Sequence, residues 1–260
     1  MRKLIPILLL AAPLAAQNYG SYNNAPVARN GFLRSASSVK GNVLQDSSLV
    51  GWWPLTAANG STARDMSGNG NDGTWSGTKA GTNGYWSAGK TGAWSGYFNS
   101  TNNLINVTNK TLNITGPITM MAWVNTTMTS GYSAVVSKGG GSFRDYYFAL
   151  RANNTLSIYI GGASGYGGQP VISPTWSTTN WTHVAVTANG ANIVAYINGQ
   201  QAASVASTAV ATNSSGSNFY IGNDVSIGTY WAKGNMADVR IYNRALSQAE
   251  IQAIYNAENH

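Results

Sequence analysis

The chain has no cysteine, which excludes a disulfide framework and a thiolate metal site. Charged residues are also scarce, at 9% of the 260 positions against about 25% in typical soluble domains. This deficit excludes a coiled coil, a helical bundle and a charged disordered chain. The sequence is instead rich in small and aromatic residues, with 30 Gly, 9 Trp and 14 Tyr. A β protein with many turns is the class that remains.

Acidic residues are especially few, because only 8 carboxylates accompany 15 lysines and arginines. The basic residues give a formal charge of +7 but are scattered, without a run or a stripe. Because a nucleic-acid footprint needs clustered Lys and Arg, no nucleic-acid partner is predicted. The acids are Asp46, Asp65, Asp72, Asp145, Asp224, Asp238, Glu250 and Glu258.

Long apolar runs are absent except near the N-terminus, where Leu4–Leu14 is almost wholly apolar. Two basic residues precede this run and small residues follow it, the order of a secretory signal peptide over residues 1–16. The run is shorter than the roughly 20 apolar residues of a membrane span, so no span is predicted. The mature chain is expected to be secreted or extracellular, with the periplasm or the cell surface included. A buried N-terminal helix is the alternative.

Residues 17–47 are polar, rich in Asn and Ser, and lack a clear hydrophobic period. They are interpreted as a flexible arm or linker ahead of a single domain over 48–260. A sharper interpretation is an extension that adds a strand to a neighbouring copy, which makes self-association the alternative role.

From Leu49 onward short apolar or alternating runs are separated by Gly, Asn and Ser turns, the pattern of β-strands. About a dozen such runs with no helices between them predict two antiparallel sheets packed face to face. The expected strands are Val50–Leu55, Tyr97–Phe98, Leu104–Val107, Ile118–Asn125, Ser133–Lys138, Tyr146–Arg151, Leu156–Ile160, Thr182–Thr187, Asn192–Ile197, Ala202–Ala206, Asn218–Ile221 and Asn235–Tyr242.

Two local signals are sharper than the rest. Asn198-Gly199 between two strand-like runs predicts a two-residue hairpin. Ser247 and Glu250 have the spacing of a capping box, and the residues after them place Ile251, Ile254 and Tyr255 on one apolar face. A short closing helix is therefore predicted near the C-terminus.

Three stretches carry a family resemblance. The first joins Leu49–Leu55 to the turn Asp65–Gly73, the second joins Trp181–Thr187 to Ala195–Gly199, and the third is Ala237–Ser247 with its helix. In this order they resemble the laminin-G-like jelly roll domains of the concanavalin A-like lectin/glucanase superfamily, from residue 49 to about 257. The resemblance implies an all-β jelly roll sandwich of two antiparallel sheets, one concave and one convex, with a short C-terminal closing helix.

Such domains are mostly non-catalytic and bind glycans or proteins, or serve as adhesive and spacer modules. The superfamily also contains glucanases similar to laminarinases, which use two carboxylates from one strand. Carboxylates on one face of a strand are two or four positions apart, and no acids of this chain have that spacing. Two distant aspartates converging in space remain the alternative. His183 is interpreted as a packed histidine, because no Gly-x-Ser-x-Gly nucleophile motif accompanies it. The chain is therefore predicted not to be an enzyme.

The turn Asp65–Gly73 offers carboxylate, amide and main-chain oxygens, which are the ligands that calcium prefers. In related domains this turn meets the last strand, which here carries Asp238. Asp65, Asn71 and Asp238 are the candidate metal ligands, and Ca²⁺ would have a structural role. The alternative is that Asp65 accepts backbone hydrogen bonds and Asp238 pairs with Arg64 or Arg240.

Sugar binding uses flat aromatic rings against apolar sugar faces, with polar side chains reading the hydroxyls. Loops at the rim of a sandwich are the usual place for such groups. The candidate ligand-binding residues, all from predicted loops, are Tyr166, Trp176, Asp224, Tyr230 and Trp231. Trp52, Trp53, Trp123 and Trp181 are instead expected on strands in the core.

These observations predict a secreted, non-catalytic module that binds carbohydrate or another extracellular surface polymer. The expected partner is a glycan or an extracellular protein. A structural or adhesive subunit of an extracellular assembly, using residues 17–47, is the alternative. A glycoside hydrolase is disfavoured by the missing carboxylate pair.

Overall fold

The computed structural model describes residues 46–90, 94–108, 110–126, 128, 130–140, 143–152, 155–161, 171–172, 180–213, 216–225 and 228–259. The predicted signal peptide and all but the last two residues of the predicted arm lie outside this part. The elements are β1 (Leu49–Trp53), β2 (Thr62–Ala63), β3 (Gly73–Ser76), β4 (Trp86–Ala88), β5 (Trp94–Asn99), β6 (Leu104–Val107), η1 (Lys110–Leu112), β7 (Ile118–Asn125), β8 (Tyr132–Gly140), β9 (Phe143–Arg151), β10 (Leu156–Ile160), β11 (Val171–Ile172), β12 (Thr182–Ala188), β13 (Asn192–Ile197), β14 (Gln200–Ala206), β15 (Phe219–Ile221), β16 (Lys233–Tyr242) and α2 (Gln248–Glu258).

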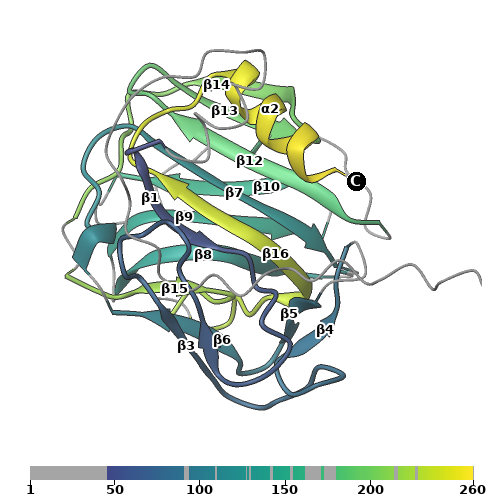
Figure 1. The fold of residues 1–260 in the computed structure, drawn as a ribbon. Helices are drawn as coiled ribbons and strands as arrows, with labels where there is room; N and C mark the ends of the chain where they lie inside the picture. The colour runs from purple at the N-terminus through teal and green to yellow at the C-terminus, as the bar shows by residue number, and fades with distance from the viewer. Residues whose placement is uncertain are drawn as a thin grey trace, which may run out of the picture. The chain divides into compact units, whose positions relative to one another are not determined.

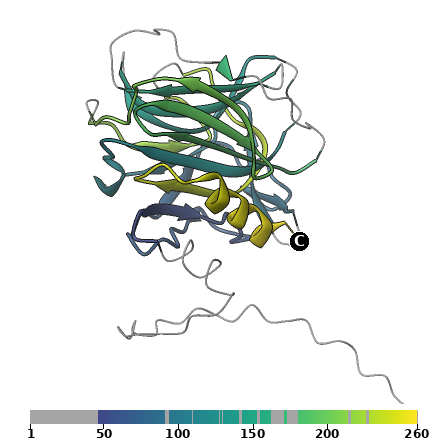
Figure 2. The ribbon, with the colours of Figure 1, turned by 90° about the horizontal axis from the view of Figure 1, so that it is seen from above.

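The strands form two sheets, and neighbouring strands pair antiparallel in both. Sheet A has the order β14-β13-β12-β7-β16-β5-β4, with β1 also paired to β16. Sheet B has the order β11-β10-β9-β8-β15-β6-β3-β2. Figure 1 and the view from above in Figure 2 show the two layers, with α2 in yellow on the side of sheet A. The predicted class, a sandwich of two antiparallel sheets with a short C-terminal helix, is confirmed.

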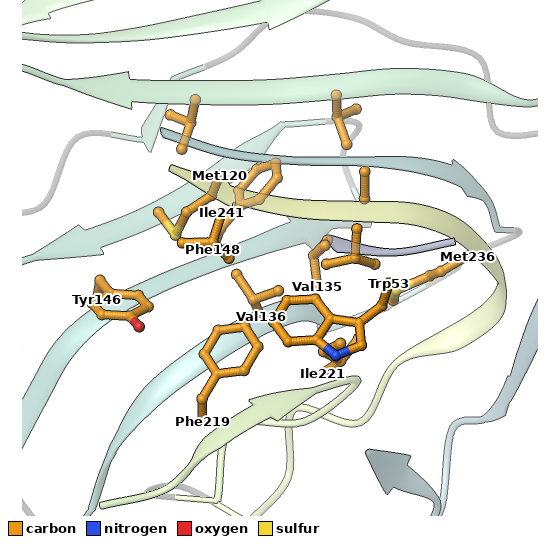
Figure 3. Close-up of a cluster of buried hydrophobic side chains, with 14 of the residues drawn as sticks. Trp53, Met120, Val135, Val136, Tyr146, Phe148, Phe219, Ile221, Met236 and Ile241 are labelled. Carbon is orange, nitrogen blue, oxygen red and sulfur yellow. The ribbon is translucent and has the colours of Figure 1, made fainter. Parts of the chain in front are cut away.

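The main core lies between the two sheets and is built around large aromatic side chains. Trp53 of β1 stacks on Phe219 of β15 with ring centroids 5.3 Å apart, and Figure 3 shows the two rings together among aliphatic side chains. A second group gathers around Trp75, whose ring stacks on Tyr85 at 4.9 Å and lies 4.8 Å from Phe98. Truncating one of these rings to alanine is expected to cost about 3–5 kcal/mol.

Sheet A is buried on both faces at its centre, and the sequence of β7 reflects this. Met120, Ala122 and Val124 belong to the core between the sheets. Met121 alternates with them and packs against α2 together with Ala185 of β12. Because both faces are covered, β7 and β12 have continuous rather than alternating apolar character.

Helix α2 closes the outer face of sheet A. Ser247 caps its first turn and exchanges hydrogen bonds with Glu250, so the predicted capping box is confirmed. Ile251 and Ile254 are buried against sheet A, as the apolar face of the helix predicted. Arg244 bonds both Glu250 and Asp46, which ties the start of the helix to the segment before β1. No helix in the described part of the chain is long and apolar enough to cross a membrane.

The hairpin predicted at Asn198-Gly199 joins β13 to β14, and both turn residues have positive φ, 50° and 78°. The expected strands all occur, four with the predicted ends and the others with shifted ends, but β2, β3, β4 and β11 were not predicted. They have only two to four residues, too few for a period to show. The expectation for Trp181 was wrong in part, because it lies just before β12 and is only half-buried.

His183 of β12 lies in the layer between sheet A and α2, where it is 1% exposed, in line with its predicted packing role. Its ring meets Trp123 of β7 edge-on at 5.4 Å and lies 6.0 Å from Tyr255 of α2. Neither imidazole nitrogen has a hydrogen-bond partner in the part of the chain that the structure describes. Burial, helped by the cations Arg240 and Lys90, lowers the pKa of His183 to about 3.

This depressed pKa predicts acid destabilisation that can be isolated with the variant His183→Phe. The unfolded chain binds a proton on this imidazole below about pH 6.5 and the folded chain only below about pH 3. The wild type should therefore lose stability relative to the variant by about 1.4 kcal/mol per pH unit as the pH falls between those values. Denaturant unfolding of both proteins from pH 7 to pH 4 measures the difference. A constant difference across that range would contradict the assignment.

Candidate functional site

The outer face of sheet B carries a cluster of tyrosines that strand alternation turns away from the core. In β9, Tyr146 and Phe148 enter the core, whereas Tyr147 between them faces outward. Tyr159 of β10 is the cross-strand partner of Tyr147. Tyr132 at the start of β8 and Tyr230 from the loop before β16 complete what we call the tyrosine face, defined as Tyr132, Tyr147, Tyr159 and Tyr230.

The rings of the tyrosine face are in contact with one another. Tyr132 and Tyr230 stack with centroids 4.3 Å apart, and Tyr230 lies 6.3 Å from Tyr147. Tyr147 and Tyr159 are buried at 3% and 8% exposure, whereas Tyr132 and Tyr230 are only half-buried. The deeper pair therefore forms a floor, and the stacked pair is the part that reaches solvent.

Two arginines border these rings, each over an aromatic face. The Arg144 guanidinium lies 5.4 Å from the Tyr147 centroid and 5.7 Å from that of Tyr159. The Arg151 guanidinium lies 5.0 Å from the Tyr132 centroid. Cations in this position are attracted to the electron-rich face of the ring, which fixes the rings and the arginines together.

Asp224 sits beneath this arrangement and accepts a 2.6 Å hydrogen bond from Arg144 Nε. The aspartate is 1% exposed, so its part here is to hold Arg144 in place and not to face solvent. Burial, together with the Asp224 carboxylate, raises the pKa of Tyr147 well above its ordinary value. The Tyr147 hydroxyl therefore stays protonated and can donate.

The structure brings only some of the candidate ligand-binding residues to the tyrosine face. Tyr230 belongs to the tyrosine face, and Asp224 supports it from below. Trp231 is half-buried and donates from Nε1 to the Gly228 carbonyl at 3.0 Å, which anchors its own loop. Tyr166 and Trp176 lie outside the described residues.

Sequence reasoning missed Tyr132, Tyr147, Tyr159, Arg144 and Arg151, although the signal was present. Alternation along β9 and β10 places Tyr147 and Tyr159 opposite the core-facing residues, so both were readable as outward aromatics. The contact of Tyr132 with Tyr230 joins residues nearly a hundred positions apart, and no local pattern reports it.

The predicted calcium turn is held by hydrogen bonds. Asp65 Oδ1 accepts from the backbone N–H groups of Trp52 and Ser67, both at 2.9 Å. Oδ2 accepts from Ser67 Oγ at 2.8 Å and from the Asn71 N–H at 2.9 Å. A carboxylate offers about four lone-pair sites, so these four donors leave none directed at a cation.

The other two candidate ligands also have partners of their own. Asn71 Oδ1 accepts a 2.6 Å bond from Thr111 Oγ1. Asp238 Oδ1 accepts from Trp52 Nε1 at 2.8 Å and from Arg240 Nη2 at 3.4 Å. Trp52 thus links Asp65 through its backbone N–H and Asp238 through its indole. This donor set does not fit calcium as it stands, and in the described residues no cluster of three or more His, Cys, Asp or Glu side chains is placed to hold a metal ion.

All eight carboxylates lie in the described residues, and each has a basic or N–H partner. Asp238 and Glu258 both contact Arg240 Nη2, and Asp46 and Glu250 both contact Arg244 Nη2. Trp123 Nε1 also donates to Glu258 at 2.8 Å. Burial raises the pKa of Glu258 to about 7, against the opposing pull of Arg240.

Comparison with known proteins places this geometry in a family. Residues 98–252 match the profile of the concanavalin A-like lectin/glucanases superfamily. The chain belongs to this superfamily. The match runs from β5 into α2 and includes the tyrosine face, whereas the Asp65–Gly73 turn precedes it. No curated protein matches this superfamily member.

Solved structures similar to this superfamily member include carbohydrate-bound proteins. Domain 4 of AbnA, a GH43 extracellular arabinanase from Geobacillus stearothermophilus in complex with arabinotriose, has a TM-score of 0.59 and 20% identity, with 80% of this chain and 98% of that domain covered. Trypanosoma rangeli sialidase in complex with 2,3-difluorosialic acid has a TM-score of 0.60 and 20% identity, with 83% of this chain covered. The alignment spans only 34% of the sialidase.

The binding domain of Paraclostridial Mosquitocidal Protein 1 is a third similar structure, with a TM-score of 0.58 and 18% identity. It is covered over 53% of its length, and 82% of this chain is aligned. At these identities the similarity shows the fold alone. Ligands and activities of these proteins are therefore properties of those proteins.

Replacing Asp65 by alanine should destabilise the domain by about 3 kcal/mol, the scale of one or two charge-assisted hydrogen bonds. The reference variant is Asp72→Ala in the same turn. Asp72 accepts from the Asp65 N–H at 2.8 Å and pairs with Arg64, and both contacts are exposed to solvent. Its expected loss is below about 1 kcal/mol. Denaturant unfolding of the three proteins measures both values.

The same unfolding experiment, run with EDTA and then with added calcium, tests the metal prediction. Since the Asp65 oxygens are occupied by protein donors, neither addition is expected to move the midpoint. A calcium-dependent rise in stability that disappears in Asp65→Ala and in Asp238→Ala would show that the turn rearranges around a metal ion.

Proposed function

We propose that this chain is a secreted, non-catalytic module that binds carbohydrate through the tyrosine face. The observation that supports the proposal most directly is the stacked, half-buried pair Tyr132 and Tyr230 on the face of sheet B opposite the core. Rings held in this way offer apolar surface to the C–H face of a sugar at little entropic cost, because packing has already fixed them.

Polar groups around the rings match the hydroxyl-rich edge of a sugar. The tyrosine hydroxyls donate and accept, and the Arg151 guanidinium donates only. The buried Tyr147 hydroxyl has no hydrogen-bond partner in the described part of the chain. A buried hydroxyl left unpaired costs free energy, so a ligand hydroxyl or a water reaching it is favoured.

The comparisons support the carbohydrate ligand at the level of the fold. The superfamily is named for lectins and glucanases, and the arabinanase domain was solved with arabinotriose. Domain 4 of that arabinanase is the useful parallel, because 98% of it is aligned with this chain. Export rests on the signal-like N-terminus, Leu4–Leu14 preceded by two basic residues.

The surroundings of the carboxylates Asp238 and Glu258 support a non-catalytic role. A retaining hydrolase needs one ionised and one protonated carboxyl group about 5–5.5 Å apart, with the sugar between them. Here Arg240 lies between Asp238 and Glu258, and its side chain is 2% exposed. A guanidinium in that place occupies the position a glycosidic bond would need.

Binding should depend on the stacked pair. Tyr132→Ala and Tyr230→Ala are each expected to weaken glycan binding by about 1–2 kcal/mol, tenfold or somewhat more. The matched control is Tyr97→Ala, which removes a half-buried tyrosine from β5 of sheet A. A broad glycan array followed by calorimetry on each retained glycan measures the effect. Folded wild type that retains no glycan, or variants that bind as well as the control, would refute the proposal.

Hydrolysis is tested separately, with the polysaccharides that the array identifies. No reducing sugar is expected to be released over prolonged incubation. Release that is lost in Asp238→Asn or in Glu258→Gln, while both variants keep the wild-type melting behaviour, would instead identify a glycoside hydrolase with these two carboxylates as its acid and base.

A further inference from the structure

We propose that the tyrosine face selects a carboxylated saccharide, and that Arg151 supplies the cation that binds its carboxylate. The inference rests on the proposed function and specifies the class of ligand. It is based on a difference between the two arginines of this face. Arg144 is paired with a carboxylate of the protein, whereas Arg151 is not.

Arg144 is neutralised internally. Its Nε lies 2.6 Å from the Asp224 carboxylate, and the two side chains are 10% and 2% exposed. This pair is sheltered from solvent. The Arg144–Asp224 pair holds Tyr147 and Tyr159 in place and adds no net charge to the surface.

Arg151 differs in each of these respects. It is the last residue of β9 and the direct cross-strand partner of Tyr132, over whose ring its guanidinium lies. Its side chain is half-buried. All eight carboxylates of the chain are in the described part, and none of the ion pairs found there includes Arg151.

The charge of Arg151 is thus held at the rim of the stacked pair with no carboxylate to meet it. A guanidinium is planar, weakly hydrated and matched to a carboxylate through two parallel hydrogen bonds. Packing over Tyr132 fixes its position, so less side-chain entropy is lost when a ligand binds. An unpaired carboxylate brought by the ligand is the group that completes this arrangement.

Nothing negative on this face opposes such a ligand. Asp224, which pairs with Arg144 of this face, is 1% exposed and so does not meet a ligand. The chain as a whole carries 15 basic residues against 8 acids, so an anion approaches a positive molecule. A sugar ring beside Tyr132 and Tyr230 with its carboxylate on Arg151 satisfies both the apolar and the charged part of the site.

The test compares two forms of one polymer, polygalacturonic acid and its fully methyl-esterified form. The sugar and the linkage are the same, and only the charge differs. The full-length mature protein is titrated with each polymer at low and at physiological salt. A carboxylated panel of uronate and sialate oligosaccharides and a neutral panel extend the comparison, and dextran sulfate reports non-specific attraction to polyanions.

The wild type is expected to prefer the acidic form by about tenfold or more, the usual scale of a charge-assisted pair. Arg151→Gln should remove that preference, so that the acidic and the esterified polymer bind equally. Arg151→Lys should restore only part of it, because an ammonium lacks the planar fork. The matched control is Arg64→Gln, which removes one positive charge from an exposed arginine in the turn before β3.

The outcomes separate this inference from the proposed function. Equal binding of the acidic and the esterified polymer that needs Tyr132 but not Arg151 would keep the proposed function and overturn the inference. An acidic preference that persists in Arg151→Gln would also overturn it, as would binding that dextran sulfate displaces equally in wild type and in Tyr132→Ala. No retention of any glycan by folded protein would overturn both.

Discussion

The whole sandwich depends on where its last strand is inserted. β16 lies inside sheet A between β7 and β5, and it changes partners along its length: Lys233–Met236 pair with β5, and Val239–Tyr242 pair with β1. The change occurs at a bulge where Asp238 has a φ of 48°, an unusual conformation that aspartate tolerates better than most residues. Its side chain bonds Trp52 Nε1, so the residue that turns the strand also holds β1. Sheet A is therefore complete only when the C-terminal strand has paired, which gives the fold a large share of non-local contacts.

This insertion sets the difference between the two outer faces. The chain emerges from β16 directly into the Arg244 link and α2, so the helix has only sheet A to cover. Its apolar residues make β7 and β12 a buried middle layer, and the aromatic cluster with His183 fills the space under the helix. In the described residues no helix packs on the outer face of sheet B, where Tyr147 and Tyr159 cluster with Ala134 and Ala149. Because the C-terminal helix covers the outer face of sheet A, the outer face of sheet B is the one left for binding.

The sequence predicted those parts of the fold that local rules determine. The capping box at Ser247, the Asn198-Gly199 hairpin and the apolar runs of β7 and β12 are each fixed by residues a few positions apart. Short strands such as β3 and β4 were not predicted. Trp75 is buried through contacts with Trp86 and Phe98, which are distant in sequence, so no hydrophobic period marks these strands. At the candidate site, Tyr230 was found as a loop aromatic. Its partners were missed, because an outward tyrosine on a strand becomes informative only when the stack across the sheet is known. At the Asp65 turn the composition suggested calcium ligands, but the Asp65 oxygens accept hydrogen bonds from the protein instead.

The scarcity of acids in this chain acquires a physical meaning at the tyrosine face. With so few carboxylates, each is placed where a fold contact needs it: Asp65 on the turn, Asp238 on the bulge, Asp224 under Arg144. Cations outnumber them, so some must remain unpaired, and a cation that is unpaired in water is ordinarily free to move. Arg151 is unpaired but held, because it lies over Tyr132 and the neighbouring strands fix that ring. A guanidinium fixed in this way loses little side-chain entropy when a carboxylate binds it. This preorganisation is the physical reason to expect the partner on the ligand.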